Sequence, residues 1–378
     1  MSDLVPAVAF PPGDYIKEAL DARGWTREEF AEIIGRTPKF VGELVKGDKA
    51  ITPRTAKELA AALGTSAILW LNLEAAYRLH HSQAPVSTRI TRQARLRERF
   101  AVREMVKRRW IEASDDPEVL EVQILQFFNI SSIDEEPRLA HAARKTGYPA
   151  DIRGPQRAWL FRVKQIASAM VTPEYSERAL REALPLLASL RGDPQNIRQI
   201  PHILSKCGVR FVIVEHVASS KIDGVCFWLQ DKGPSPVIGM SLRLDRIDNF
   251  WFVLRHECEH VLQGHGREEA IVDRDIASTD SSQPIPDEEV IANAAAAEFC
   301  VPKAEMEDFM IRHRPLYSEE KVVKFARRMQ VHPGLVVGQL QHILHDFRLF
   351  KKYQISVRPL VAPYSMTDGY GQVVPNTL

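Results

Sequence analysis

Cysteines, net charge and long apolar runs are all scarce in this chain of 378 residues. Four cysteines are too few for a disulfide scaffold at this length, so we expect free thiols. A net charge of +1 excludes a uniformly basic nucleic-acid binder, so any contact with nucleic acid must come from a local patch. Apolar runs stay below membrane length, and Met1-Ser2-Asp3-Leu4 lacks the basic and apolar parts of a secretory signal. The sequence therefore predicts a cytoplasmic protein without a membrane partner.

Apolar material, by contrast, is plentiful. Hydrophobic residues make up 45% of the chain, which supports two or three domains with their own cores. Most of them recur at helical spacing, while short β-rich runs separated by turn residues occur at 209–214, 224–229 and 236–242. The sequence therefore predicts a mainly α protein with a small β-sheet, in the α+β class.

The most informative motif is His256-Glu257-Cys258-Glu259-His260. Residues four apart lie on one face of a helix, so the imidazoles of His256 and His260 can bind the same zinc ion. Glu257 lies at the edge of that face, where its carboxylate can act as general base on a water whose pKa zinc lowers towards about 7. The alternative is a buried helix with solvated histidines.

A second segment, 289–302, favours the zinc interpretation. As a helix it presents Glu289 on the same face as Ala292 and Ala296, and these small residues allow close packing against the histidine helix. Glu289 then becomes the third ligand and leaves one position open for water. An open position is typical of a catalytic zinc site rather than a structural one.

These two segments resemble the ImmA/IrrE family of metallopeptidases, in which an HExxH helix is followed by E-x-x-A-N-x-x-A and a later proline. The matching residues are His256, Glu257, His260, Glu289, Ala292, Asn293, Ala296 and Pro302. The resemblance covers roughly Gln199 to Gln354. It implies a zincin-like peptidase domain in which His256, His260 and Glu289 bind zinc and Glu257 is the catalytic base.

Two residues depart from the family pattern or are unusual beside the site. Ala295 stands where the family often has a larger apolar residue. Cys258 is either a small buried thiol or a group that makes the site sensitive to oxidation and foreign metals.

Four further residues could act as donors near the site, but the sequence assigns them no role: His265, His313, Tyr317 and His332. The last β-rich run, 236–242, is expected to border the cleft and to bind an extended peptide by strand addition.

A helix-turn-helix pattern occupies the first part of the chain. Thr26 and Glu29 form a capping box that starts one short helix, and Gly35 ends it. Thr37 caps the next helix, which carries a proline in its first turn and ends at Lys46. Two short helices joined by a tight turn are typical of DNA-binding helix-turn-helix units.

This first unit, 11–81, resembles XRE-type helix-turn-helix domains, most closely those of HigA-like antitoxins. The agreement is specific at Trp70-Leu71-Asn72-Leu73. The resemblance implies a homodimer on double-stranded operator DNA and a role in transcription regulation. The residues that it places near DNA are Thr37, Lys39, Phe40, Glu43, Lys46 and Lys49. Because an acidic Glu43 suits DNA poorly, a helix-turn-helix kept for dimerisation or partner contact remains an alternative.

The remainder of the chain reads as helical connections. Basic residues far outnumber acidic ones between Arg89 and Arg109, and this stretch either neutralises DNA phosphates or forms a solvated helix face. Further helices are predicted over 117–130, 154–170, 175–190, 319–329 and 333–344. The predicted organisation is a DNA-binding domain at 11–81, a helical connecting region at 82–198, a peptidase domain at 199–354 and an extended tail at 355–378.

Two functions remain open from the sequence. The first is a DNA-binding transcriptional regulator with a zinc metallo-endopeptidase domain that cleaves a regulatory protein, such as a repressor or antitoxin. The second is a HigA-like antitoxin and operon autorepressor, whose peptidase fold serves cognate toxin binding or sensing without proteolysis. The intact set of zinc ligands and base favours the first function, and the HigA-like front end favours the second.

Overall fold

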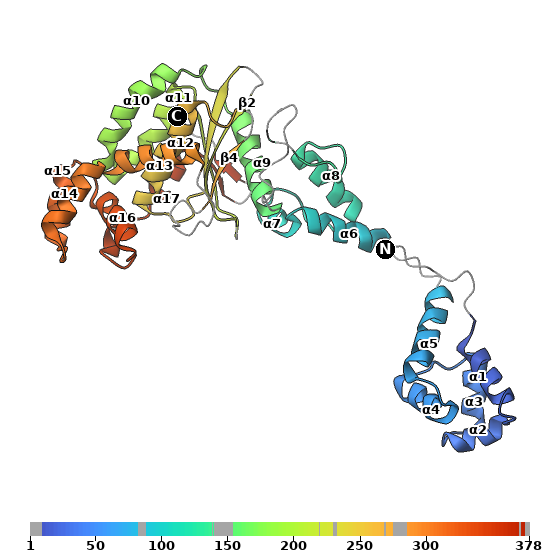
Figure 1. Cartoon of the computed structure of the whole chain (residues 1–378). Coiled ribbons are helices and arrows are strands. Elements are labelled where there is room, and N and C mark those ends of the chain that lie inside the picture. The colour runs from blue at the N-terminus through green and yellow to red at the C-terminus, as the bar shows by residue number, and fades with distance from the viewer. Residues whose placement is uncertain are drawn as a thin grey trace. The chain divides into compact units, whose positions relative to one another are not determined.

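The computed structural model describes residues 10–81, 88–137, 139, 154–218, 220–229, 233–267, 270–274, 286–369 and 372–374. Contacts divide the chain into two compact units, Met1–Thr91 and Arg92–Leu378 (Figure 1). Helices predominate and one small mixed sheet accompanies them, which confirms the predicted α+β class. Among the described residues, no helix is both long and apolar enough to cross a membrane.

The N-terminal unit is a helical bundle. Its helices are α1 (Pro12–Asp21), α2 (Arg27–Ile33), α3 (Pro38–Lys46), α4 (Pro53–Leu63) and α5 (Ala67–His81). They enclose a core that includes Ile16, Phe30, Val41, Leu59 and Trp70. The sequence did not predict α5 as a helix, because its apolar residues lie on several sides: Trp70 is buried, while Ile68 and Leu79 are exposed.

The predicted caps set the boundaries of α2 and α3. The Glu29 amide donates to Thr26 Oγ1 at 3.1 Å, and the Thr26 amide donates back to the Glu29 carboxylate at 2.8 Å. The Phe40 amide donates to Thr37 Oγ1 at 3.2 Å, and Gly47 ends α3 with a φ of 79°. Each such cap contributes about 1 kcal/mol to helix stability, which explains why short helices persist here.

The C-terminal unit is built on a mixed sheet. Its strands are β1 (Arg210–Val214), β2 (Ile222–Leu229), β3 (Ser235–Met240), β4 (Ile271–Arg274), β5 (Met366–Gly369) and β6 (Gln372–Val374). Their order is β4-β2-β3-β1-β5-β6, with β1 parallel to both β3 and β5 and the other pairs antiparallel. The three predicted β-rich runs are therefore confirmed as β1, β2 and β3.

Helices cover both faces of this sheet (Figure 1). Alternate residues of β1 show the arrangement, because Phe211 and Ile213 join one core while Val212 and Val214 join the other. The second core includes residues of α6 (Thr88–Arg99), α7 (Val102–Lys107), α8 (Pro117–Phe128) and α9 (Gly154–Ala169). The first includes residues of α10 (Glu177–Ser189), α11 (Ile200–Lys206), α12 (Ile247–Gln263), α14 (Lys303–His313), α15 (Glu319–Arg328) and α16 (Pro333–Leu344).

The middle and tail regions differ from the sequence prediction. Residues expected only to connect two domains pack directly on the sheet: Trp159 of α9 is buried and its indole N–H donates to the Val214 carbonyl at 2.8 Å. The tail, expected to be extended, forms α17 (Arg358–Val361), β5 and β6. Val212 of β1 pairs with Met366 of β5, so long-range pairing gives strand structure to a segment with weak local preference.

Several residues of the basic stretch make ion pairs or hydrogen bonds within the C-terminal unit. Arg92 pairs with Glu118 at 2.8 Å and Arg95 with Asp134 at 2.6 Å. The side chain of Arg108 is buried and donates to the Glu215 carbonyl at 2.8 Å. The basic residues that remain exposed in this stretch include Arg97, Arg103, Lys107 and Arg109.

The prediction that the run 236–242 binds a peptide by strand addition is wrong. β3 lies inside the sheet between β1 and β2, so both sides of its backbone are already paired. An interior strand cannot accept a further strand. On the β2 side of the sheet, the outermost strand is β4, which pairs with β2.

Candidate metal centre

Helix α12 carries the histidine motif, and an apolar stripe along it is buried. Ile247, Phe250, Leu254, Cys258 and Val261 are all buried. The helix ends at a glycine: Gly264 adopts a left-handed conformation with a φ of 71°, and its amide donates to carbonyls of the last turn. The apolar stripe fixes the helix in the core, and this orientation determines where the two histidines point.

Three side chains from α12 and α13 (Asp287–Cys300) converge. The Nε2 atoms of His256 and His260 lie 3.0 Å apart, and the Glu289 carboxylate oxygens lie 3.3 Å from His256 Nε2 and 3.5 Å from His260 Nε2. Three ligands at 2.0–2.1 Å around a tetrahedral zinc ion would be about 3.3 Å apart. The donor set and its spacing therefore fit zinc, with His256, His260 and Glu289 as the residues that would hold it.

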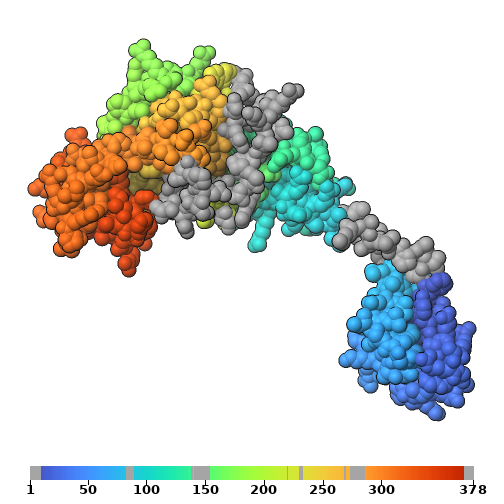
Figure 2. All heavy atoms as spheres, in the orientation of Figure 1, coloured from blue at the N-terminus to red at the C-terminus, as the bar shows by residue number. Residues whose placement is uncertain are grey.

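Small residues bring α13 close to α12, as the sequence predicted. Ala292 and Ala296 are fully buried where the two helices pack together. Glu289 lies one turn earlier, and its side chain is 23% exposed, whereas both histidine side chains have no exposed area. In Figure 2, the orange residues of α13 and α14 form part of the outer surface of the C-terminal unit. Glu289 thus connects a buried imidazole pair to the exterior.

Glu257 is buried beside this cluster and lies against strand β2. A Cβ atom at Gly224 would be 1.9 Å from Glu257 Oε1 and 2.9 Å from Val253 Cγ1. Glycine at this position leaves room for the carboxylate, which a Cβ atom would displace. Gly224 could not be predicted from the sequence, because its role depends on β2 packing against α12 and leaves no local pattern.

His265 is a second residue that the sequence could not assign. Its Nδ1 lies 3.0 Å from Nδ1 of His260, on the opposite side of that ring from the cluster. The signal that could have found it is an imidazole just after the helix end, between Gly264 and Gly266, both of which have positive φ. Such a turn can fold back toward the last turn of the helix.

The other donors considered from sequence lie elsewhere. His313 packs edge-on against Phe309, with ring centroids 4.9 Å apart, and Tyr317 stacks on the same ring at 6.1 Å. His332 caps α16. Burial raises the pKa of Cys258 to about 12, so its thiol is protonated at neutral pH. This result favours the buried-thiol alternative for Cys258 over a reactive group.

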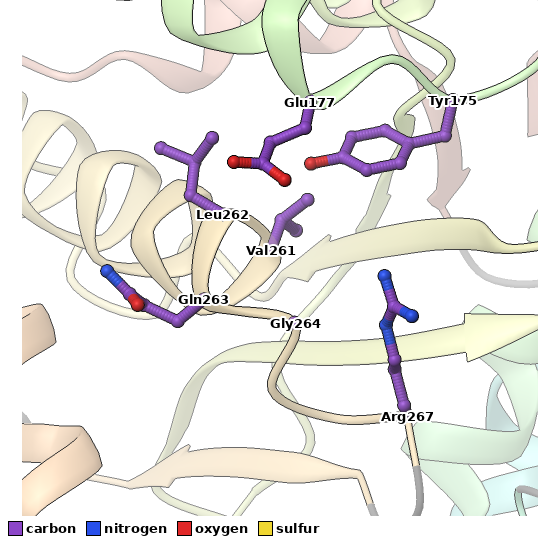
Figure 3. Close-up of a pocket in the computed structure, with 7 residues that line it drawn as sticks. All are labelled: Tyr175, Glu177, Val261, Leu262, Gln263, Gly264 and Arg267. Atoms are coloured by element: carbon purple, nitrogen blue, oxygen red, sulfur yellow. The ribbon is translucent and has the colours of Figure 1, made fainter.

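A separate pocket of about 310 Å³ lies at the C-terminal end of α12 (Figure 3). It is lined by Tyr175, Glu177, Val261, Leu262, Gln263, Gly264 and Arg267. The Tyr175 hydroxyl points toward the Glu177 carboxylate, and burial raises the pKa of this tyrosine to about 12. The Arg267 guanidinium lies 4.4 Å from the ring centroid of Trp228. Because the proposed ligands and base do not line this pocket, we assign it no part in the zinc chemistry.

The residues expected to face DNA lie on or beside α3. Thr37 is the N-cap, and Lys39 and Lys46 are exposed. Glu43 is paired with two lysines, at 4.0 Å from Lys39 Nζ and 3.4 Å from Lys49 Nζ. These pairs offset the acidic charge of Glu43, which would otherwise be unfavourable for DNA binding.

Phe40, the remaining residue of this set, is flanked by two cations. The Arg36 guanidinium lies 4.9 Å from its ring centroid and Lys49 Nζ lies 4.6 Å from it. The α3 surface therefore presents a half-buried aromatic ring among basic groups.

Comparisons with known proteins concern the same N-terminal region. Residues 16–70 match the family model described as Helix-turn-helix. The uncharacterised HTH-type transcriptional regulator YddM of Escherichia coli (strain K12) is 36% identical over 75 residues, which is 20% of this chain and 80% of that protein. A crystal structure of a candidate antidote protein of a plasmid maintenance system from Nostoc punctiforme is 34% identical over 19% of this chain and 80% of that chain, with a TM-score of 0.19. Through its N-terminal domain, the chain belongs to the XRE-type helix-turn-helix family of DNA-binding regulators.

Proposed function

We propose that this protein is a transcriptional regulator that joins its helix-turn-helix domain to a zinc metallo-endopeptidase domain. The observation that carries the proposal is the convergence of His256, His260 and Glu289, with ligand atoms within 4.8 Å of one another. Glu257, adjacent in sequence and buried beside them, supplies the carboxylate that peptide hydrolysis needs.

The chemistry divides between the metal and the chain. A zinc ion held by the three ligands would supply a Lewis acid and lower the pKa of water towards about 7. The Glu257 carboxylate accepts a proton as water attacks the peptide carbonyl, and it then returns that proton to the leaving amine. Gly224 leaves room for this carboxylate, and Glu289 belongs to the metal rather than to proton transfer.

The substrate class that we propose is a regulatory protein, such as a repressor or antitoxin. This follows from the resemblance to ImmA/IrrE peptidases together with a DNA-binding domain in the same chain. The alternative is a HigA-like antitoxin and autorepressor whose peptidase fold binds a cognate toxin without proteolysis. Burial supports this alternative, because His256, Glu257 and His260 have no exposed surface in the part of the chain that the structure describes.

The DNA partner that we propose is a double-stranded operator bound by a homodimer. Support for a dimer comes from α5, where Ile68 and Leu79 are 69% and 77% exposed. Exposed apolar side chains on one helix suit a self-complementary contact between two copies.

A first prediction tests the proposed metal site and the base separately. The wild-type protein should contain about one zinc ion per chain, Glu289→Ala should lose most of it, and Glu257→Gln should retain it. Metal content is measured by mass spectrometry, and hydrolysis is measured on a panel of unfolded peptides. Only the wild type should cleave them.

The outcomes separate the two functions. Zinc in the wild type without any hydrolysis would favour the non-proteolytic alternative. Full hydrolysis by Glu257→Gln would contradict the assigned base. Absence of zinc from every variant, even after reconstitution, would contradict the metal site itself.

A further inference from the structure

The starting observation is that both ring nitrogens of His260 have partners. Nε2 faces the cluster, 3.0 Å from His256 Nε2 and 3.5 Å from Glu289 Oε1. Nδ1 faces away from it and lies 3.0 Å from His265 Nδ1. The two sides of one imidazole are thus used for different purposes.

This arrangement fixes where the ring protons must lie when a metal is bound. A nitrogen that binds zinc needs its lone pair, so the proton of neutral His260 must reside on Nδ1. Nδ1–H then donates, and His265 Nδ1 must accept with its own lone pair. His265 therefore carries its proton on Nε2.

Hydrogen bonds of its own backbone fix the position of His265. Its amide donates to the His260 carbonyl at 2.9 Å, and its carbonyl accepts from the Trp228 indole N–H at 2.7 Å. A Cβ atom at Gly266 would be 2.7 Å from the Cys226 carbonyl, so the turn lies directly against β2. Strand β2 thereby sets the position of the His265 ring.

We propose that His265 is a positioning residue that acts through His260, holding it in the tautomer and orientation that metal binding requires. This inference rests on the proposed zinc site. Partners of this kind orient ligand histidines, and their loss commonly costs about 10–100-fold in metal affinity. His265 itself does not belong to the group whose ligand atoms converge, which consists of His256, His260 and Glu289.

The test is the zinc affinity of the full-length protein, measured by competition with a chelator, for the wild type and two variants. His265→Phe keeps a ring of similar size but removes the acceptor, and should weaken zinc binding about 10–100-fold. His265→Asn places an amide oxygen near the former Nδ1 position, and should bind within a few-fold of the wild type. A structural role that needs only volume would give the opposite order.

The remaining outcomes are also decisive. Equal zinc affinity of the wild type and His265→Phe overturns this inference but not the proposed function, and so does His265→Asn binding as weakly as His265→Phe. A wild type that binds no zinc overturns the proposed function and this inference together. Should His265→Phe fail to fold, Trp228→Phe removes the donor to the His265 carbonyl and should weaken zinc binding several-fold; unchanged affinity overturns the inference.

Discussion

At the scale of single residues, the position of Glu257 depends on the absence of a side chain in the neighbouring strand. In Gly224→Ala, the new Cβ atom would lie only 1.9 Å from the present position of Glu257 Oε1. The carboxylate must move by about 1 Å or more, and misplacement of that size costs about 100-fold in rate. We expect peptide hydrolysis to fall by about that factor, while the zinc content stays near one per chain.

Gly369→Ala is the matched control for this substitution. Gly369 is likewise a strand glycine, the last residue of β5, but a Cβ atom there would meet nothing within 4 Å. Its hydrolysis rate should equal that of the wild type. If Gly224→Ala were fully active, the close approach of β2 to Glu257 would have no catalytic importance.

Another prediction at this scale concerns the charges on α3. Lys39→Ala removes an exposed cation and should weaken operator binding, reducing the salt dependence of log K by about one unit of slope. Glu43→Gln should do the reverse, because it frees Lys39 and Lys49 from their ion pairs. Binding is measured by fluorescence anisotropy at several salt concentrations.

Lys303→Ala provides the control for the lysine substitution. Lys303 pairs with Glu307 at 3.9 Å and its side chain is 82% exposed, much like Lys39, which pairs at 4.0 Å and is 86% exposed. DNA affinity should not change in this variant. An unchanged affinity in Lys39→Ala as well would indicate that α3 does not read DNA.

At the scale of helices, α16 begins with an unusual cap. Nδ1 of His332 accepts the Gly334 amide proton at 3.1 Å, and burial lowers the pKa of this imidazole, with Asp193 opposing the shift. Below about pH 6.5 the unfolded chain takes up a proton that the native chain does not. The stability of the C-terminal unit should therefore fall as the pH drops from 7.5 to 5.5.

His332→Asn keeps a capping acceptor without a titrating group, so this variant should lose less stability over the same pH range. Urea unfolding in the presence of EDTA measures the difference, with His342→Asn, an exposed position in the same helix, as control. Equal pH dependence of His332→Asn and the wild type would contradict this role of the cap.

Local patterns predicted the elements well where a single helix carries its own signal. The capping residues predicted α2 and α3, and the histidine spacing predicted α12. α14 was missed, although Met306, Phe309 and Met310 are buried on one side of it. β5 and β6 were missed because the segment acquires strand structure by pairing with β1, which is distant in sequence.

The same contrast holds within the candidate site. His256, His260 and Glu289 were predicted because their spacing reflects one helix face and a short following helix. Gly224 and His265 were not, because their significance arises from contacts between β2, α12 and the turn after it. Sequence patterns reveal residues that share one helix face. They do not reveal residues whose role depends on contacts between elements distant in sequence.

At the scale of the whole molecule, the division into two units predicts two unfolding transitions. Zinc binds only to the C-terminal unit in our proposal, so EDTA should lower the midpoint of one transition and leave the other unchanged. At a free zinc concentration 100 times Kd, the stabilisation lost is about 2.7 kcal/mol. Differential scanning calorimetry measures both midpoints.

The Glu289→Ala variant is the control for the EDTA experiment. Neither of its two midpoints should respond to EDTA. The midpoint of its C-terminal unit should coincide with that of the same unit in the metal-free wild type. A shift of both wild-type transitions on chelation would show that the two units do not unfold independently.

The pairing of β1 with β5 also has a consequence for biosynthesis. β1 ends at Val214, yet β5, one of its two partner strands, begins only at Met366. Chains grow by about 5–20 residues per second and fold from the N-terminal end. The helix-turn-helix bundle can therefore fold long before the sheet beneath the candidate metal centre is complete, so a nascent chain acquires its DNA-binding domain well before its proposed peptidase domain.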